Sequence, residues 1–142
     1  MIIPDANILL YAYNADAPQH ARAAAWVEKL FSGPETIGLA WVTLWAFLRL
    51  STNSRVWPNP KSAAQALDVI KSWLARPDVV IVHPGERHAE LLEGLVSRYR
   101  VTGPLFSDAA LAALALEHGA VLASSDQDFR RFPELKWINP LA

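Results

Sequence analysis

The alternation of short apolar runs with longer segments of helical periodicity is the feature that most constrains this chain. The short runs suit buried strands, whereas the longer segments repeat their apolar residues at helical spacing. Strands are predicted at residues 2–4, 36–39, 79–82, 120–123 and 136–139. Helices are predicted at residues 20–31, 41–48, 62–74, 86–99 and 108–118. This order predicts an α/β domain with a central, mainly parallel sheet flanked by helices.

The composition allows a folded core and excludes several classes of protein. The chain has 142 residues, of which 52% are hydrophobic and 19% charged, and we expect residues 1–142 to form one domain. No apolar stretch approaches the ~20 residues of a membrane-spanning helix, so we expect no membrane segment. No basic region precedes the first apolar residues, so we expect no secretory signal. The absence of cysteine excludes disulfides and thiolate metal sites, and it fits a cytoplasmic protein.

The charge balance sets a condition on any nucleic-acid partner. The chain has 13 basic and 14 acidic side chains, and its formal net charge is -1. A protein that coats nucleic acid nonspecifically is instead strongly basic. A nucleic-acid substrate would therefore need local basic patches on this chain, or charge compensation by a metal ion.

Four aspartates lie where predicted elements begin or end. Asp5 follows the first strand, Asp108 stands in the first turn of a helix, and Asp126 and Asp128 follow the strand at 120–123. Taken singly, each acid is better explained as a helix cap or as a partner of the helix dipole. The carboxyl ends of parallel strands meet at one edge of a sheet, however, and clustered carboxylates need a hard cation to coexist. Together the acids predict a divalent-metal site and chemistry on phosphates.

The segments around these acids resemble those of a known family. They follow one another in a fixed order along the whole chain: Asp5-Ala6-Asn7, Phe47-Leu48-Arg49, Ser107-Asp108-Ala109, Glu117-His118-Gly119 and Ser124-Ser125-Asp126-Gln127-Asp128-Phe129. This set resembles the PIN domain, in particular the VapC toxins of bacterial type II toxin–antitoxin pairs. The segments at residues 45–49, 52–56 and 137–141 resemble a VapC subgroup that is abundant in mycobacteria.

The resemblance implies a toxin that is a metal-dependent endoribonuclease. Members of the family use Mg²⁺ or Mn²⁺ and cut structured RNA such as tRNA or rRNA. They are commonly homodimers, and a small VapB-type antitoxin inhibits them.

The resemblance also assigns roles to individual residues by their position. Asp5 and Asp108 would be primary metal ligands, and Asp126 would be the third acid of the catalytic site. Asp128 is a weaker candidate, because it could instead cap the turn that follows. Asn7 and Ser124 would hydrogen-bond to the acids or to the scissile phosphate.

One position departs from the family pattern. Most PIN nucleases place a glutamate just before the Phe-Leu-Arg segment, whereas this chain has Ala46. The mycobacterial-type subgroup commonly has a small residue there too, so the change does not imply an inactive enzyme. It favours one bound ion over two. Glu93, in another predicted helix, is a candidate replacement carboxylate, although nothing in the sequence places it near the site. A catalytically weak or inactive PIN fold that binds RNA or a partner is the alternative that Ala46 leaves open.

An arginine and several tryptophans could serve either in binding or in packing. Arg49 would bind an RNA phosphate or pair with a buried acid. The spacing of Trp41 and Trp45 predicts packing in the core or at an interface, and they could also line a groove for an antitoxin helix. Trp57, in the proline-containing loop at residues 53–60, is the tryptophan that we expect to contact RNA or a partner. A phosphatase is disfavoured, because the segment after Asp5 lacks the second acid of an Asp-x-Asp nucleophile motif.

Overall fold

The computed structural model describes residues 1–142 and contains a five-stranded sheet in the order β3-β2-β1-β4-β5. All four strand pairs are parallel, which confirms the predicted sheet type. The strand order reverses between β1 and β4, and ligands of such open sheets bind in the crevice at this point. The strands are β1 (Ile2–Pro4), β2 (Ile37–Leu39), β3 (Val79–Ile81), β4 (Val121–Ala123) and β5 (Trp137–Ile138).

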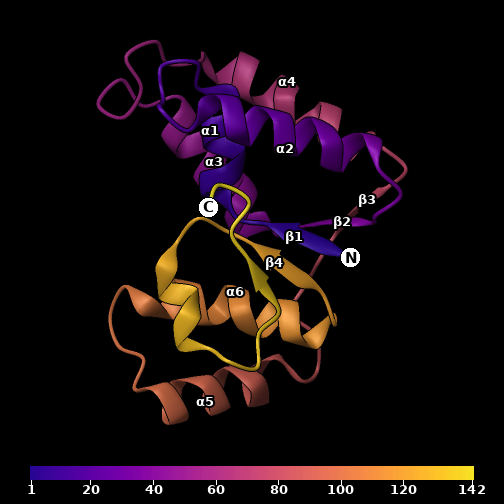
Figure 1. Cartoon of the computed structure of the whole chain (residues 1–142), viewed down its shortest axis with the longest axis vertical. Coiled ribbons are helices and arrows are strands. Elements are labelled where there is room, and N and C mark those ends of the chain that lie inside the picture. The colour runs from indigo at the N-terminus through magenta and orange to yellow at the C-terminus, as the bar shows by residue number, and fades with distance from the viewer.

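Helices cover both faces of this sheet (Figure 1). Helices α1 to α4 lie on one side together with one hydrophobic cluster, and α5 and α6 lie on the other side with a second cluster. No helix is both long enough and apolar enough to span a membrane. The helices are α1 (Ala6–Tyr13), α2 (His20–Ser32), α3 (Trp41–Ser51), α4 (Ala63–Leu74), α5 (His88–Tyr99) and α6 (Leu105–Glu117), and a short 3₁₀ helix η1 follows β4 (Gln127–Arg131).

Helix α1 has no counterpart among the predicted helices. Its three consecutive residues Ile8, Leu9 and Leu10 are all buried, so its apolar residues do not recur at helical spacing. The signal was instead at its start, because the Asp5 side chain accepts a hydrogen bond from the Ala6 amide as the N-cap. The predicted cap was therefore correct, although the helix after it was missed.

The ends of the other helices follow their local chemistry. Ser62 and Gln65 form a capping box at the start of α4, which confirms the predicted start. Gly119 has a φ of 60° directly after α6, which suits glycine at the end of a helix. Helix α6 begins at Leu105, earlier than predicted, so that Asp108 lies in its first turn.

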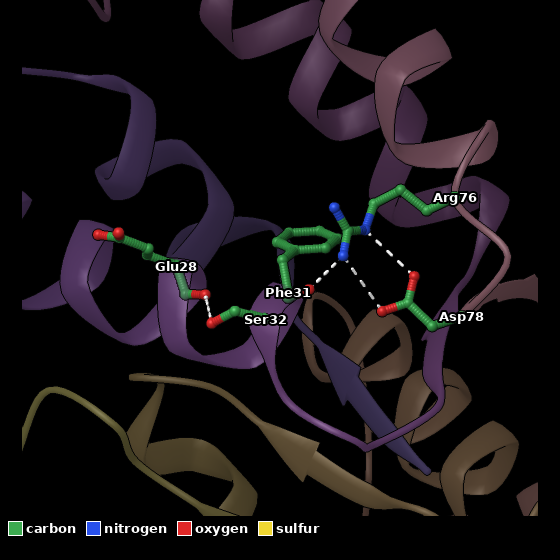
Figure 2. A network of polar contacts seen from close by, with 5 residues as sticks. All are labelled: Glu28, Phe31, Ser32, Arg76 and Asp78. Atoms are coloured by element: carbon green, nitrogen blue, oxygen red, sulfur yellow. Dashed lines mark hydrogen bonds and ion pairs between the residues drawn. The ribbon is translucent and has the colours of Figure 1, made fainter.

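An arginine joins helix α2 to the turn before β3 (Figure 2). The Arg76 guanidinium lies 4.9 Å from the centre of the Phe31 ring and donates to the Phe31 carbonyl oxygen. It also pairs with Asp78, with an Nε to Oδ1 distance of 3.1 Å. In the last turn of the same helix, the Ser32 hydroxyl donates to the Glu28 carbonyl oxygen at 2.7 Å. The contacts of Arg76 with Phe31 and Asp78 attach the turn before the edge strand β3 to the helical layer.

The structure overturns one prediction about tryptophans and narrows another. Trp57 is only 4% exposed and belongs to the hydrophobic cluster of α1 to α4, so it does not face RNA or a partner. Burial of its large ring outweighs its position in a loop. Trp41 and Trp45 are instead 39% and 60% exposed, so core packing is excluded for them, and packing at an interface is the part of the prediction that is left. The exposed side of α3 carries them.

Candidate metal centre

The centre forms where β1 and β4 lie next to each other at their carboxyl ends. Their parallel register pairs Pro4 with Ala123, so the next residues along the chain, Asp5 and Ser124, are neighbours. The Asp5 amide donates to the Ala123 carbonyl oxygen at 2.8 Å, which extends this pairing beyond the strand. The two polar side chains, which are 119 positions apart in the sequence, therefore meet at the point where the strand order reverses.

The Ser124 hydroxyl is the centre of a hydrogen-bond network. It donates to Asp5 Oδ2 at 2.7 Å. It accepts from Asn7 Nδ2 and from the Asp126 amide, each at 3.1 Å. Ser124 is fully buried, and these three contacts use the one donor and both lone pairs of its hydroxyl. Its side chain is therefore fixed, and it holds Asp5 and the start of the Asp126 turn in a set relation.

Three of the four aspartates come together beside this network. One carboxylate oxygen from each of Asp108, Asp126 and Asp128 lies within 4.8 Å of the other two. Asp108 comes from the first turn of α6, whereas Asp126 and Asp128 come from the start of η1. This confirms that acids far apart in the sequence converge.

The division of roles between Asp126 and Asp128 differs from the one expected. Asp126, and not Asp128, caps the following turn, because Asp126 Oδ1 accepts the Asp128 amide at 2.9 Å. The exposed Asp128 carboxylate instead joins the cluster. Asp5 is not one of the three clustered acids, and its oxygens accept hydrogen bonds from Ala6, Ser124 and Asn7.

The electrostatics of the acids show uncompensated repulsion. The pKa of Asp108 is raised to about 6, mainly by burial and then by the negative charges of Asp126, Asp5 and Asp128. Burial also raises the pKa of Asp5, despite the hydrogen bond that Ser124 donates to it. None of the ion pairs in the structure involves any of these acids. A bound cation would remove the repulsion that basic side chains leave in place.

The donor set fits a hard divalent cation. It consists of carboxylate oxygens, which are the ligands that Mg²⁺ and Mn²⁺ prefer. Asp108 and Asp126 are half-buried and Asp128 is exposed, so the cluster is open to solvent and to a substrate. Such a site leaves room for water and for a phosphate oxygen on the ion.

Arg49, Ala46 and Glu93 lie outside the acid cluster. Arg49 is exposed on α3 and makes no ion pair, so pairing with a buried acid is excluded. Ala46 is half-buried on the same helix and offers no ligand. Glu93 is exposed on α5 and is not grouped with the acids.

An apolar groove extends to the residue before Asp108. It has a volume of about 450 Å³, and its lining includes Trp41, Trp45, Val82 and Ser107. The Trp41 and Trp45 rings have their centroids 6.3 Å apart. Ser107 directly precedes Asp108, so the groove adjoins the metal centre along the chain. Val82 was expected in a strand, and no sequence pattern indicated that it lines this groove.

A profile of the PIN domain matches residues 2–135 of this chain. The chain belongs to the PIN-domain family. Ribonuclease VapC33 of Mycobacterium tuberculosis is 42% identical to it over 141 residues, which cover 99% of each chain. This identity over the full length places the chain in the VapC branch of the PIN-domain family, as the ordered segments predicted.

Solved structures of VapC proteins share the fold. VapBC2 from Rickettsia felis, bound to a DNA fragment from its promoter, matches with a TM-score of 0.72 and 21% identity over 98% of both chains. VapC20 from Mycobacterium tuberculosis, a toxin that cleaves the sarcin–ricin loop, matches with a TM-score of 0.68 and 20% identity over 96% of this chain and 98% of its own. At these identities, the likeness concerns the fold.

Proposed function

We propose that residues 1–142 act as a single PIN domain, the toxin of a type II toxin–antitoxin pair. Its activity would be Mg²⁺-dependent hydrolysis of phosphodiester bonds in structured RNA such as tRNA or rRNA. The observation that carries the proposal is the convergence of Asp108, Asp126 and Asp128 beside the network of Asp5 and Ser124. The identity with VapC33, which is named a ribonuclease, supports the same reaction.

The acids would divide into a ligand set and a supporting set. Asp5, Asp108 and Asp126 would hold the ion, as the resemblance implies, and Asp128 would be an auxiliary ligand, which its place in the carboxylate cluster supports. A bound Mg²⁺ or Mn²⁺ would supply an activated water and charge stabilisation at the scissile phosphate. Ser124 and Asn7 would keep Asp5 in position through their hydrogen bonds. Arg49 would contact an RNA phosphate, which its exposed and unpaired guanidinium supports.

Cleavage by purified protein is the direct test of this proposal. Wild-type protein should cut a pool of tRNA and rRNA with Mg²⁺ or Mn²⁺ but not with EDTA, and Asp108→Asn should abolish cleavage and growth arrest. Asp68→Asn is a matched control, because Asp68 is an exposed acid on α4, outside the cluster. Full toxicity of a folded Asp108→Asn variant would contradict the proposal.

The alternative is a PIN fold that binds RNA or a partner without cutting it, and Ala46 is the observation in its favour. Tight RNA binding with no metal-dependent product across the pool would establish this alternative.

Under the main proposal, we expect one ion per chain, since one cluster of three carboxylates is present. Calorimetric titration with Mn²⁺ measures this number directly, and a stoichiometry of two would contradict the single-ion site.

A VapB-type antitoxin would bind the groove beside Asp108 with the apolar face of a helix. The exposed Trp41 and Trp45 and the apolar lining suit such a helix, and its presence would block access of RNA to the acids. Trp45→Ser should weaken capture of the co-expressed antitoxin, whereas Trp57→Phe, at a buried position, should not. If Trp45→Ser captures as much antitoxin as wild type does, the antitoxin binds to another surface.

We also propose a homodimer. Large apolar side chains remain exposed outside the groove, among them Leu67 and Val80. Sedimentation of the purified toxin at micromolar concentration should give twice the mass of the chain. A monomer under these conditions would contradict this part of the proposal.

A further inference from the structure

The carbonyl oxygen of Ser124 is held by a side chain, although it lies in line with a strand ladder. Strand β5 pairs with β4 through the Leu122 amide, which donates to the Lys136 carbonyl oxygen at 2.8 Å. Two residues further on, the Ser124 amide donates to the Ile138 carbonyl oxygen at 3.0 Å. A parallel ladder continues in steps of two residues, so the next donor, toward the Ser124 carbonyl oxygen, would be the amide of residue 140.

Residue 140 is a proline and has no amide hydrogen. The indole of Trp137 replaces the missing donor, because its Nε1–H donates to the Ser124 carbonyl oxygen at 3.0 Å. Strand β5 therefore binds both backbone polar groups of Ser124, the amide through Ile138 and the carbonyl through the Trp137 side chain. Ser124 is fully buried, so water does not take the place of this donor.

The position of the Ser124 backbone decides where its hydroxyl lies, and the hydroxyl contacts both Asp5 and the Asp126 amide. We propose that Trp137 is a positioning residue of the metal centre, acting through Ser124 on the distance between Asp5 and the Asp126 turn. Trp137 itself touches none of the acids through a hydrogen bond. This inference rests on the proposed metal centre.

The test is the affinity of the full-length protein for Mn²⁺, measured by calorimetry. Trp137→Phe removes the N–H and keeps an aromatic ring, and we expect it to weaken Mn²⁺ binding about tenfold, the lower end of the range for residues that orient ligands from behind. Trp73→Phe is the matched control. It also removes an indole donor, which bonds to the Tyr13 hydroxyl at 3.1 Å, but it does so in the cluster of α1 to α4. It should change Mn²⁺ affinity by less than about twofold.

A merely structural role of Trp137 is separated by a double-mutant cycle. If Trp137 acts through Ser124, the losses of Mn²⁺ affinity in Trp137→Phe and Ser124→Ala should not add in the double variant. Replacement of Trp137 by β-(3-benzothienyl)alanine, which keeps the ring shape and lacks the N–H, should reproduce the loss without disturbing the packing.

The outcomes are distinguishable from a failure of the proposed function. Wild-type protein that does not bind Mn²⁺ would overturn the metal centre and this inference together. Wild-type protein that binds Mn²⁺, with Trp137→Phe within twofold of it, would overturn the inference alone. Equal losses in Trp137→Phe and Trp73→Phe, or additive losses in the cycle, would overturn it as well.

Discussion

Replacing Asp108 by asparagine should stabilise the metal-free protein while removing its response to metal. Burial and the three neighbouring acids raise the pKa of Asp108 from 3.8 to about 6. This shift corresponds to at most about 3 kcal/mol of unfavourable free energy for the ionised carboxylate in the folded state. Asp108 is partly exposed, and solvent screening reduces the figure to roughly 1–2 kcal/mol.

A second effect opposes this gain. Asp108 lies in the first turn of α6, where a negative charge interacts favourably with the helix dipole. Loss of that interaction costs about 0.5 kcal/mol. We therefore expect metal-free Asp108→Asn to be more stable than wild type by roughly 1 kcal/mol at neutral pH.

The sign of the pH dependence follows from the raised pKa. The folded state holds the Asp108 proton more tightly than the unfolded state, so this group lowers the stability of wild type as pH rises from about 4 to about 6. The penalty is complete above pH 6 and absent below about pH 4. The advantage of Asp108→Asn should therefore be largest at about pH 7.5 and should shrink as pH falls toward 4.

Urea denaturation in EDTA at several pH values measures both the gain and its pH dependence. Addition of Mn²⁺ at about 100 times its dissociation constant should then stabilise wild type by ~2.7 kcal/mol and the variant by much less. Asp68→Asn, an exposed change outside the cluster, should match wild type both in EDTA and in its stabilisation by Mn²⁺. If Asp108→Asn is no more stable than wild type in EDTA at neutral pH, the acids do not repel one another as described.

Three further predictions concern the scaffold. Trp57→Ala should lower the free energy of unfolding by about 3–5 kcal/mol, because Trp57 is 4% exposed in a core cluster, and a loss under 1 kcal/mol in urea would show that its burial matters little. Arg76→Met should cost about 1–2 kcal/mol through its contacts with Phe31 and Asp78, whereas Arg87→Met, in an exposed pair of 3.9 Å, should be nearly neutral in the same assay. Gly119→Ala should lower stability by about 1 kcal/mol because of its φ of 60°, and an unchanged melting temperature would contradict this.

The fold was largely predictable because it depends on patterns that are local in the sequence. Short apolar runs and helical periodicity predicted the strands of the sheet and all the helices except α1 and η1. Helix α1 was missed because Ile8, Leu9 and Leu10 are consecutive and all buried, so its apolar residues show no helical periodicity. The burial of Trp57 was missed because a residue's place in a loop does not tell which way its ring turns.

The site was predictable only in part: the topology brings acids from distant segments together, but the exact set of acids that meet did not follow from the sequence. Parallel strand ends placed Asp5 and the segment after β4 together, and the start of a helix added Asp108. The membership of Asp128 depends on the 3₁₀ turn, in which Asp126 and not Asp128 supplies the cap. The central role of the Ser124 hydroxyl depends on its distances to Asp5 and to the Asp126 amide, and the spacing of residues in the sequence does not give these distances.

The hydrogen bond between Asp5 and Ser124 joins residues 119 positions apart, and strand β5 comes later still. Ribosomes add about 5–20 residues each second, so a growing chain exposes its first half for several seconds before the second half exists. During that time Asp5 has no partner hydroxyl, and the acids of α6 and η1 have not been made. The metal centre therefore cannot assemble on a partly synthesised chain. A cell that makes this protein does not encounter a finished site until strand β5 has been synthesised and has docked beside β4.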